Sequence, residues 1–195
     1  MTAPVEQRKR RLGREDWIAA ALDAIAQGGL SAVAVEPLAA RLGVTKGSFY
    51  AHFSSRDELI EAALQSWEHS HGQAELDRFA AIDDPAERLQ ALLLAAITFS
   101  QGGALSVHVG LLGELADERV AGVLARVNES RIRVLTRTYS QLGFARHRAG
   151  DRARLSYAAY LGLLQMAREA PDRRLGEREI ARFMTEVNSV LIDRP

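Results

Sequence analysis

The residues with the clearest capacity for chemistry lie in one short stretch, from Thr45 to Arg56. This stretch carries hydroxyl, ammonium, imidazole and guanidinium groups, which donate hydrogen bonds to phosphates and to the edges of bases. Its small residues would let it enter a major groove without steric conflict. We therefore expect DNA-contacting side chains at these positions: Thr45, Lys46, Gly47, Ser48, Tyr50, His52 and Arg56.

These side chains are expected to divide by the part of DNA that they contact. Lys46 and Ser48 are the candidates for base edges, which carry the sequence information. The candidates for phosphate contacts, which set the position of a protein on the duplex, are Thr45, Tyr50, His52 and Arg56.

Two short helices joined by a tight turn would position these groups. Leu38, Ala39 and Leu42 share one helical face, and Gly43 follows where a left-handed residue ends a helix. In the second helix Phe49 and Phe53 lie four residues apart and point inward, and Thr45 is suited to cap its start. Such a hairpin also occurs as a purely structural part of helical domains, so the pattern alone leaves both interpretations open.

The flanking segments favour DNA binding. Lys and Arg outnumber Asp and Glu within the first 56 residues, whereas acidic residues are in excess in the remainder. Residues 1–12 form an expected flexible basic arm that holds Arg8, Lys9, Arg10 and Arg11. The arm would either reach the DNA backbone or minor groove, or remain a solvated tail. After the hairpin, Ser55 and Glu58 have the spacing of a capping box that starts another helix.

Taken together, these motifs resemble the N-terminal domain of the TetR family of bacterial transcriptional regulators. The resemblance covers roughly residues 14–64 and rests on Gly28-Gly29-Leu30, Leu38-Ala39, the run from Gly43 to Tyr50, His52-Phe53 and Arg56-Asp57-Glu58-Leu59. It implies a sequence-specific regulator, most simply a repressor, whose partners are a double-stranded palindromic operator and a small-molecule effector that releases it.

The remaining sequence predicts helices only, because no segment shows sustained alternation with period two. Asp84-Pro85 and Asp117 are signals for helix starts, and Gly143, Pro171 and Gly176 interrupt the apolar pattern. The expected fold is all-α, with a three-helix helix-turn-helix domain at residues 13–56 and a larger helical effector-binding and dimerisation domain at residues 57–195. Helices are expected at about 14–27, 56–79, 85–100, 105–115, 117–142, 151–169 and 177–192.

The last two expected helices have broad apolar faces. One of them carries small residues at the centre of its stripe, which lets another helix approach closely. The stripe consists of Leu155, Ala158, Ala159, Gly162 and Met166. The resemblance implies a homodimer that packs these two helices into a four-helix bundle, and the alternative is that both faces are used within one chain.

The resemblance also implies an internal pocket for the effector, built from apolar walls and a few polar groups. Polar and aromatic residues embedded in the apolar helices are the candidates for this role. They are Trp67, Phe99, His108, Glu114, Asn128, Tyr139, Tyr157, Tyr160 and Gln165. His108 is the most suggestive of them, because a buried imidazole needs a partner that a ligand can supply.

No constellation in the sequence predicts catalysis, a cofactor or a metal site. The chain has no cysteine, and the Glu-x-x-His spacing of Glu68 and His71 occurs once, whereas di-iron bundles need a second copy.

Met1 to Gln7 lacks the apolar core of a signal peptide, and the longest apolar run, Ala91 to Ile97, is too short to cross a bilayer. We expect a cytoplasmic protein with no membrane partner. The remaining alternative is a helical small-molecule-binding or enzymatic protein with a structural hairpin.

Overall fold

The computed structural model describes residues 12–101, 106–173 and 175–192, and these residues form helices and no strand. This confirms the expected all-α class. The helices are α1 (Arg14–Gly28), α2 (Val35–Leu42), α3 (Lys46–Tyr50), α4 (Arg56–Trp67), α5 (Glu75–Ala80), α6 (Pro85–Gln101), α7 (Val107–Leu112), α8 (Glu118–Gln141), α9 (Arg146–Glu169) and α10 (Glu177–Leu191). Short helical turns are η1 (Leu30–Ala32), η2 (Glu68–Ala74) and η3 (Pro171–Arg173). The predicted arm, apart from Leu12, and the side chain of His71 lie outside the described residues.

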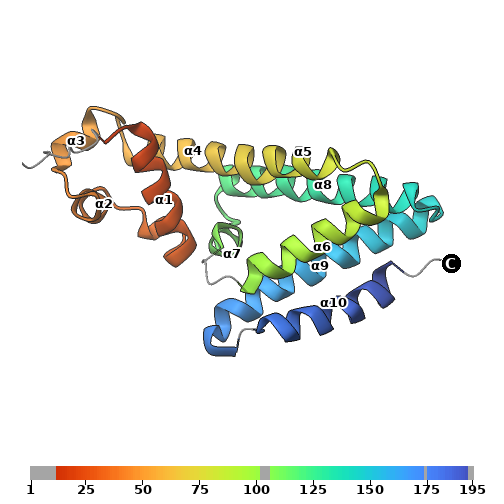
Figure 1. Cartoon of the computed structure of the whole chain (residues 1–195). Helices are drawn as coiled ribbons and strands as arrows, with labels where there is room; N and C mark the ends of the chain where they lie inside the picture. The colour runs from red at the N-terminus through yellow and green to blue at the C-terminus, as the bar shows by residue number, and fades with distance from the viewer. Residues whose placement is uncertain (1–11, 102–105, 174, 193–195) are drawn as a thin grey trace, which may run out of the picture.

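Helices α1, α2 and α3 gather at one end of the molecule (Figure 1). Gly29 and Gly43, with φ near +69° and +68°, end α1 and α2 in a backbone conformation that glycine adopts without strain. Trp17 of α1 and Phe49 and Phe53 around α3 are buried together, so apolar packing fixes the angle between the helices. The helix-turn-helix predicted from the sequence is therefore present.

A long helical rod leads away from this end and is made of α4, η2 and α5 (Figure 1). The Ser55 hydroxyl caps its start by accepting a hydrogen bond from the backbone N–H of Glu58 at 3.1 Å. The helix expected over 56–79 is thus found, but its central part, η2, is a π-helix that the sequence pattern did not predict. The buried Gly72 of η2 faces Val127 of α8.

Helices α6, α8, α9 and α10 pack into the larger part of the molecule, where α6 lies along α9 (Figure 1). The predicted start of α9 at residue 151 was wrong, because the helix begins at Arg146. Phe144 and Ala149 are buried in the core of this part, and that burial outweighs the cost of Gly150 inside a helix. Within the described residues no helix is both long and apolar enough to cross a membrane.

Candidate DNA-binding surface and effector pocket

Helix α3 presents a polar outer face on an apolar anchor. Thr45, Lys46, Gly47 and Tyr50 are exposed, whereas Ser48 and His52 are half-buried. The anchor is Phe49, which is fully buried and packs edge-on against Trp17 at a ring distance of 5.3 Å. Thr45 occupies the position before α3 as predicted, but its hydroxyl makes no capping hydrogen bond. Four of the predicted DNA-contacting residues around α3 are therefore accessible, and Ser48 and His52 are partly accessible.

The ammonium group of Lys46 pairs with a carboxylate of the preceding helix. Lys46 Nζ lies 2.6 Å from Glu36 Oε1, and both side chains are more than half exposed. The hydrogen bond from Lys46 holds the pKa of Glu36 below its usual value, and the same contact raises the pKa of Lys46. A DNA phosphate or base would have to compete with Glu36 for this cation.

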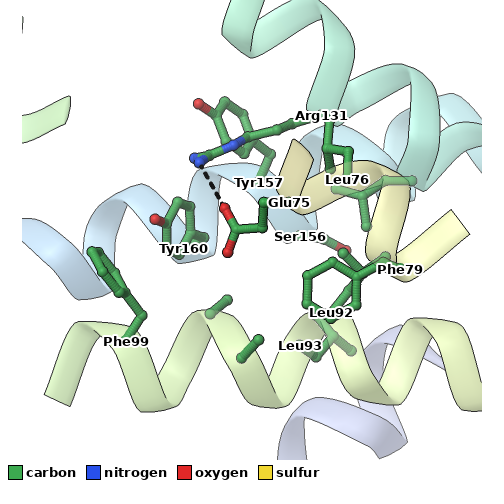
Figure 2. Close-up of a pocket in the computed structure, with 13 residues that line it drawn as sticks. Glu75, Leu76, Phe79, Leu92, Leu93, Phe99, Arg131, Ser156, Tyr157 and Tyr160 are labelled. Carbon is green, nitrogen blue, oxygen red and sulfur yellow. Dashed lines mark ion pairs between the residues drawn. The ribbon is translucent and has the colours of Figure 1, made fainter. Parts of the chain in front are cut away.

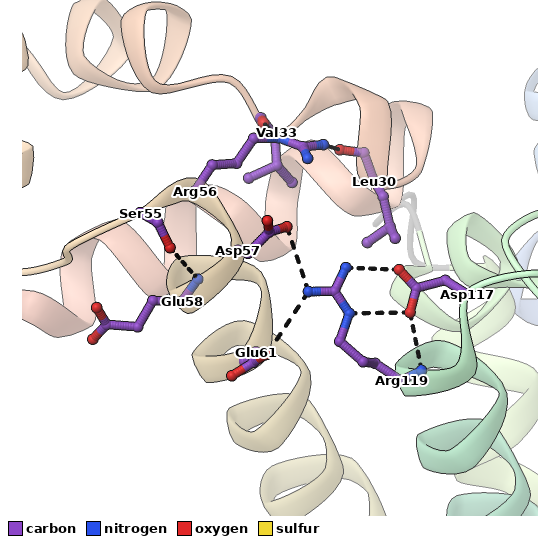
Figure 3. Close-up of polar contacts among 9 residues, drawn as sticks. All are labelled: Leu30, Val33, Ser55, Arg56, Asp57, Glu58, Glu61, Asp117 and Arg119. Atoms are coloured by element: carbon purple, nitrogen blue, oxygen red, sulfur yellow. Dashed lines mark hydrogen bonds and ion pairs between the residues drawn. The ribbon is translucent and has the colours of Figure 1, made fainter.

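Arg56 is placed differently from the other predicted DNA contacts. Its guanidinium donates hydrogen bonds to the backbone carbonyls of Val33, at 2.6 Å, and Leu30 (Figure 3). These bonds tie the start of α4 to the loop before α2. The structure thus uses the Arg56 guanidinium inside the helix-turn-helix domain, and the sequence pattern gave no sign of this because the carbonyls lie far away along the chain.

Helix α7 packs directly against the backbone of α1. Gly110 lies so close that a Cβ atom added to it would sit 2.1 Å from the Ile25 carbonyl oxygen. A few residues further along, the Glu114 carboxylate accepts a hydrogen bond from the backbone N–H of Leu30 at 2.9 Å. Glu114 was a predicted effector contact, but the structure places it at this junction and not in the pocket.

A second junction joins α8 to α4. Figure 3 shows Arg119 between Asp57 and Glu61 of α4 and the neighbouring Asp117. Arg119 donates to Asp117 at 2.7 Å and lies 3.4 Å from Asp57 and 3.9 Å from Glu61. Hydrogen bonds from Arg119 lower the pKa of Asp117 to about 2. The helix-turn-helix domain is therefore contacted by α7, and the first turns of α4, which leads out of that domain, are held at the start of α8.

A pocket lies between α5, α6, α8 and α9 (Figure 2). The space within it, including its open mouth and the adjoining solvent, is about 680 Å³. The lining residues are Glu75, Leu76, Phe79, Leu92, Leu93, Ala95, Ala96, Phe99, Arg131, Leu135, Ser156, Tyr157 and Tyr160. The walls are mostly apolar, and one ion pair, between Arg131 and Glu75, faces into the space.

The predicted effector residues fall into three groups. Phe99, Tyr157 and Tyr160 line the pocket. A second group supports that lining: Trp67 and His108 lie behind Tyr157, Asn128 accepts a hydrogen bond from the Tyr157 hydroxyl, and Tyr139 is bonded to Ser156. The third group, Glu114 and Gln165, lies outside the pocket. Glu114 is at the junction with α1, and Gln165 is exposed on α9, where it bonds to Glu169.

Sequence reasoning missed the two charged residues of the pocket. Neither Arg131 nor Glu75 is among the residues predicted from the sequence to contact the effector. A signal was available for Arg131, since it falls on the apolar face of α8 that also carries Val127 and Leu135. A cation on such a face is buried with its helix, and here the Arg131 side chain is only 11% exposed.

His108 forms the back of the pocket region. It is 2% exposed and stands between the rings of Trp67 and Tyr157, at 5.7 and 6.3 Å. Neither ring nitrogen has a hydrogen-bond partner among the described residues. Burial, assisted by the positive charge of Arg131, lowers the pKa of His108 to about 4. The imidazole is therefore neutral near pH 7, and it connects α7 to the pocket wall.

Comparisons with known proteins agree with this arrangement. Residues 18–63 match the family of bacterial regulatory proteins called the tetR family. No curated protein matches the sequence. Among solved structures, a TetR transcriptional regulator from Legionella pneumophila superposes with a TM-score of 0.77 at 15% identity, covering 94% of this chain and 99% of that one.

Two further solved structures share the fold. AibR, in complex with isovaleryl coenzyme A and operator DNA, has a TM-score of 0.64 at 23% identity and covers 88% of this chain and 95% of its own. SmeT, the repressor of the Stenotrophomonas maltophilia multidrug efflux pump SmeDEF, has a TM-score of 0.61 at 20% identity, with coverages of 92% and 90%.

A helix-turn-helix domain joined to a helical domain with an internal pocket defines a class of protein, the DNA-binding transcriptional regulators. Within that class, residues 18–63 match the DNA-binding domain of the tetR family of bacterial regulatory proteins. The whole chain shares its fold with the solved TetR transcriptional regulator from Legionella pneumophila.

Proposed function

We propose that this protein is a homodimeric repressor that binds a palindromic operator through α3 and is released by a small molecule in the pocket. The observation that carries the proposal is the exposed polar face of α3, held on the buried Phe49. Thr45, Lys46, Gly47, Ser48, Tyr50 and His52 are the proposed DNA contacts. We leave Arg56 out of this set, because its guanidinium is bonded to backbone carbonyls.

Dimerisation is supported by the surface of α9. All five residues of its small-residue stripe, Leu155, Ala158, Ala159, Gly162 and Met166, are exposed in the single chain. The side chains of Leu155 and Met166 are 53% and 66% exposed, and Val190 of α10 is 61% exposed. A two-fold dimer through this surface would place two copies of α3 on one duplex, which a single short helix needs for specificity.

Effector control is supported by the continuity between the pocket and the DNA-binding domain. Tyr157 of the pocket contacts His108 of α7, and α7 packs on α1 through Gly110. A ligand that moves Tyr157 would thus shift α7 against α1. The structurally similar AibR was solved with a small molecule and operator DNA, and SmeT is named as a repressor.

The dependence of DNA affinity on salt tests the proposal. With ~6 to 8 phosphate contacts per dimer, log K should fall with log[salt] at a slope of roughly −5 to −7. Lys46→Ala should weaken binding to a specific duplex by roughly tenfold or more and reduce discrimination between sequences. A slope near zero, or a Lys46→Ala variant with unchanged affinity and specificity, would contradict binding through α3.

A further inference from the structure

The charged pair in the pocket indicates which kind of molecule the pocket takes. Arg131 of α8 and Glu75 of α5 meet between Tyr157 and Tyr160, with Phe99, Leu92 and Leu93 facing them from α6 (Figure 2). Apart from the hydroxyl of Ser156, which is bonded to Tyr139, the rest of the lining is apolar or aromatic. A molecule that fills this space must therefore offer an apolar body and must meet one pair of opposite charges.

The two charges are not equivalent, because Arg131 is the deeper one. The Arg131 side chain is 11% exposed and that of Glu75 is 34% exposed. The Arg131 guanidinium carbon lies 5.3 Å from the Tyr160 ring centre and 6.0 Å from that of Tyr157, so two aromatic faces hold it in place. A guanidinium also keeps its charge at every physiological pH, whereas the more exposed carboxylate of Glu75 can turn to solvent. The buried charge of the pocket is therefore the positive one.

The contact between Arg131 and Glu75 is long enough for a ligand carboxylate to replace Glu75. Arg131 Nη2 and Glu75 Oε2 are 3.7 Å apart, beyond the 2.7–3.2 Å of a direct N–H···O hydrogen bond. A ligand carboxylate can approach a guanidinium with two parallel hydrogen bonds, which are stronger than this contact. Glu75 lies at the start of α5 and is the more exposed partner. Its carboxylate can therefore turn to solvent when a ligand carboxylate takes its place beside Arg131. A cationic ligand would instead have to displace the buried Arg131.

We propose that the pocket binds amphipathic carboxylates, with the carboxylate on Arg131 in place of Glu75 and the apolar part against α6 and α9. This inference rests on the proposed function, because it takes the pocket to be the effector site. A ligand bound to Arg131 would then move Tyr157 against His108, since the ring of Tyr157 lies between Arg131 and α7.

Isothermal titration calorimetry of the full chain with three probes of equal chain length tests the inference. The probes are octanoate, octan-1-ol and octylamine at pH 7.5, which share the apolar tail and differ in head group. We expect octanoate to bind about tenfold or more tightly than octan-1-ol, and octylamine to bind no better than the alcohol. Equal affinities for octanoate and octan-1-ol, or a preference for octylamine, would overturn the inference.

Two pocket variants separate the roles of the charges. Arg131→Gln should remove the preference for octanoate over octan-1-ol, whereas Glu75→Gln should tighten octanoate binding because it removes the competing carboxylate. Arg133→Gln is the matched control, since Arg133 lies on the same helix but pairs with Glu129 on the surface. If circular dichroism shows that Arg131→Gln is unfolded, the test rests on Glu75→Gln. Unchanged or weaker octanoate binding by Glu75→Gln would then contradict the proposed replacement of Glu75 by a ligand carboxylate.

The same preparation is also titrated with duplex DNA. This distinguishes a failure of the proposed ligand class from a failure of the proposed DNA-binding function. Sequence-specific DNA binding without a preference for octanoate would overturn the ligand class and leave the regulator intact. A preference for octanoate that Arg131→Gln abolishes, without any specific DNA binding, would overturn the proposed function and support the ligand class.

Discussion

The lysine of α3 that is proposed to contact DNA is already paired within the chain. Lys46 bonds to Glu36 at 2.6 Å, and Glu36 lies on α2 beside the surface that would meet the phosphate backbone. A carboxylate at this place acts against DNA in two ways: it occupies the lysine, and it repels phosphates. The pair should therefore limit non-specific affinity, since a duplex must offer Lys46 a better partner than Glu36.

Replacing Glu36 should accordingly strengthen DNA binding. In Glu36→Gln we expect affinity for non-specific duplex to rise by roughly twofold to tenfold at low salt, and the gain to shrink as salt increases. Fluorescence anisotropy with a labelled random-sequence duplex measures this affinity at each salt concentration. The matched control is Glu87→Gln, an exposed glutamate at the start of α6. Weaker binding by Glu36→Gln would show that Glu36 holds Lys46 in place for DNA.

His108 gives the protein a pH dependence of stability. Its pKa is lowered from 6.5 to about 4 in the folded state, so the unfolded chain takes up a proton at a higher pH than the folded chain does. The free energy of unfolding should therefore fall as the pH drops from 6.5 towards 4. By pH 5 the loss relative to pH 7 is about 2 kcal/mol.

The variant His108→Phe should remove that loss. Phenylalanine keeps an aromatic ring between Trp67 and Tyr157 and cannot take up a proton. Urea unfolding at pH 7 and pH 5 should show a drop in stability smaller by about 2 kcal/mol than in the wild type. His147→Gln, at an exposed position of α9, serves as control and should retain the full drop. An unchanged drop in His108→Phe would assign the pH dependence to other groups.

At the scale of helices, the contact between α7 and α1 depends on the absence of a side chain at Gly110. In Gly110→Ala the new Cβ would lie 2.1 Å from the Ile25 carbonyl oxygen, so α7 must move away from α1. We expect the variant to lose about 1–3 kcal/mol of stability and to change the effect of pocket ligands on DNA binding. Thermal unfolding and DNA titration measure the two effects.

Gly113→Ala is a close control for this substitution. It makes the same change in the segment that follows α7, but nothing lies within 4 Å of the new Cβ. Its stability and DNA affinity should equal those of the wild type. Equal behaviour of Gly110→Ala and Gly113→Ala would show that the approach of α7 to α1 is not required.

The sequence predicted the elements better than their junctions. Local signals such as Gly43, Ser55 and Asp117 mark helix ends, because each acts within one turn of its own chain. Arg56 and Glu114 were assigned to ligands because they are polar, but their partners are backbone groups distant in sequence. The Arg131 pair was missed for a related reason: the apolar face of α8 indicates that Arg131 is buried, but only the packing of α5 against α8 shows that Glu75 is its partner.

For the molecule as a whole, the exposed stripe of α9 is the expected interface between two copies. Ala159→Arg would place a long charged side chain at the centre of this stripe, where close helix packing needs small residues. Analytical ultracentrifugation should then show monomers where the wild type forms dimers, and operator affinity should fall because one α3 binds alone. Ala125→Arg, at an exposed position on α8, should remain dimeric. A dimeric Ala159→Arg variant would place the interface elsewhere.

The central claim is that two copies of α3 read a specific DNA sequence, and selection of bound duplexes from a randomised pool tests it most directly. The purified protein is used at ~0.15 M salt, where weak non-specific binding is suppressed. We expect a palindromic consensus whose half-sites are separated by about one helical turn or a multiple of it, and its loss in Lys46→Ala. If a folded dimer enriched no sequence, with and without added octanoate, that result would contradict the account.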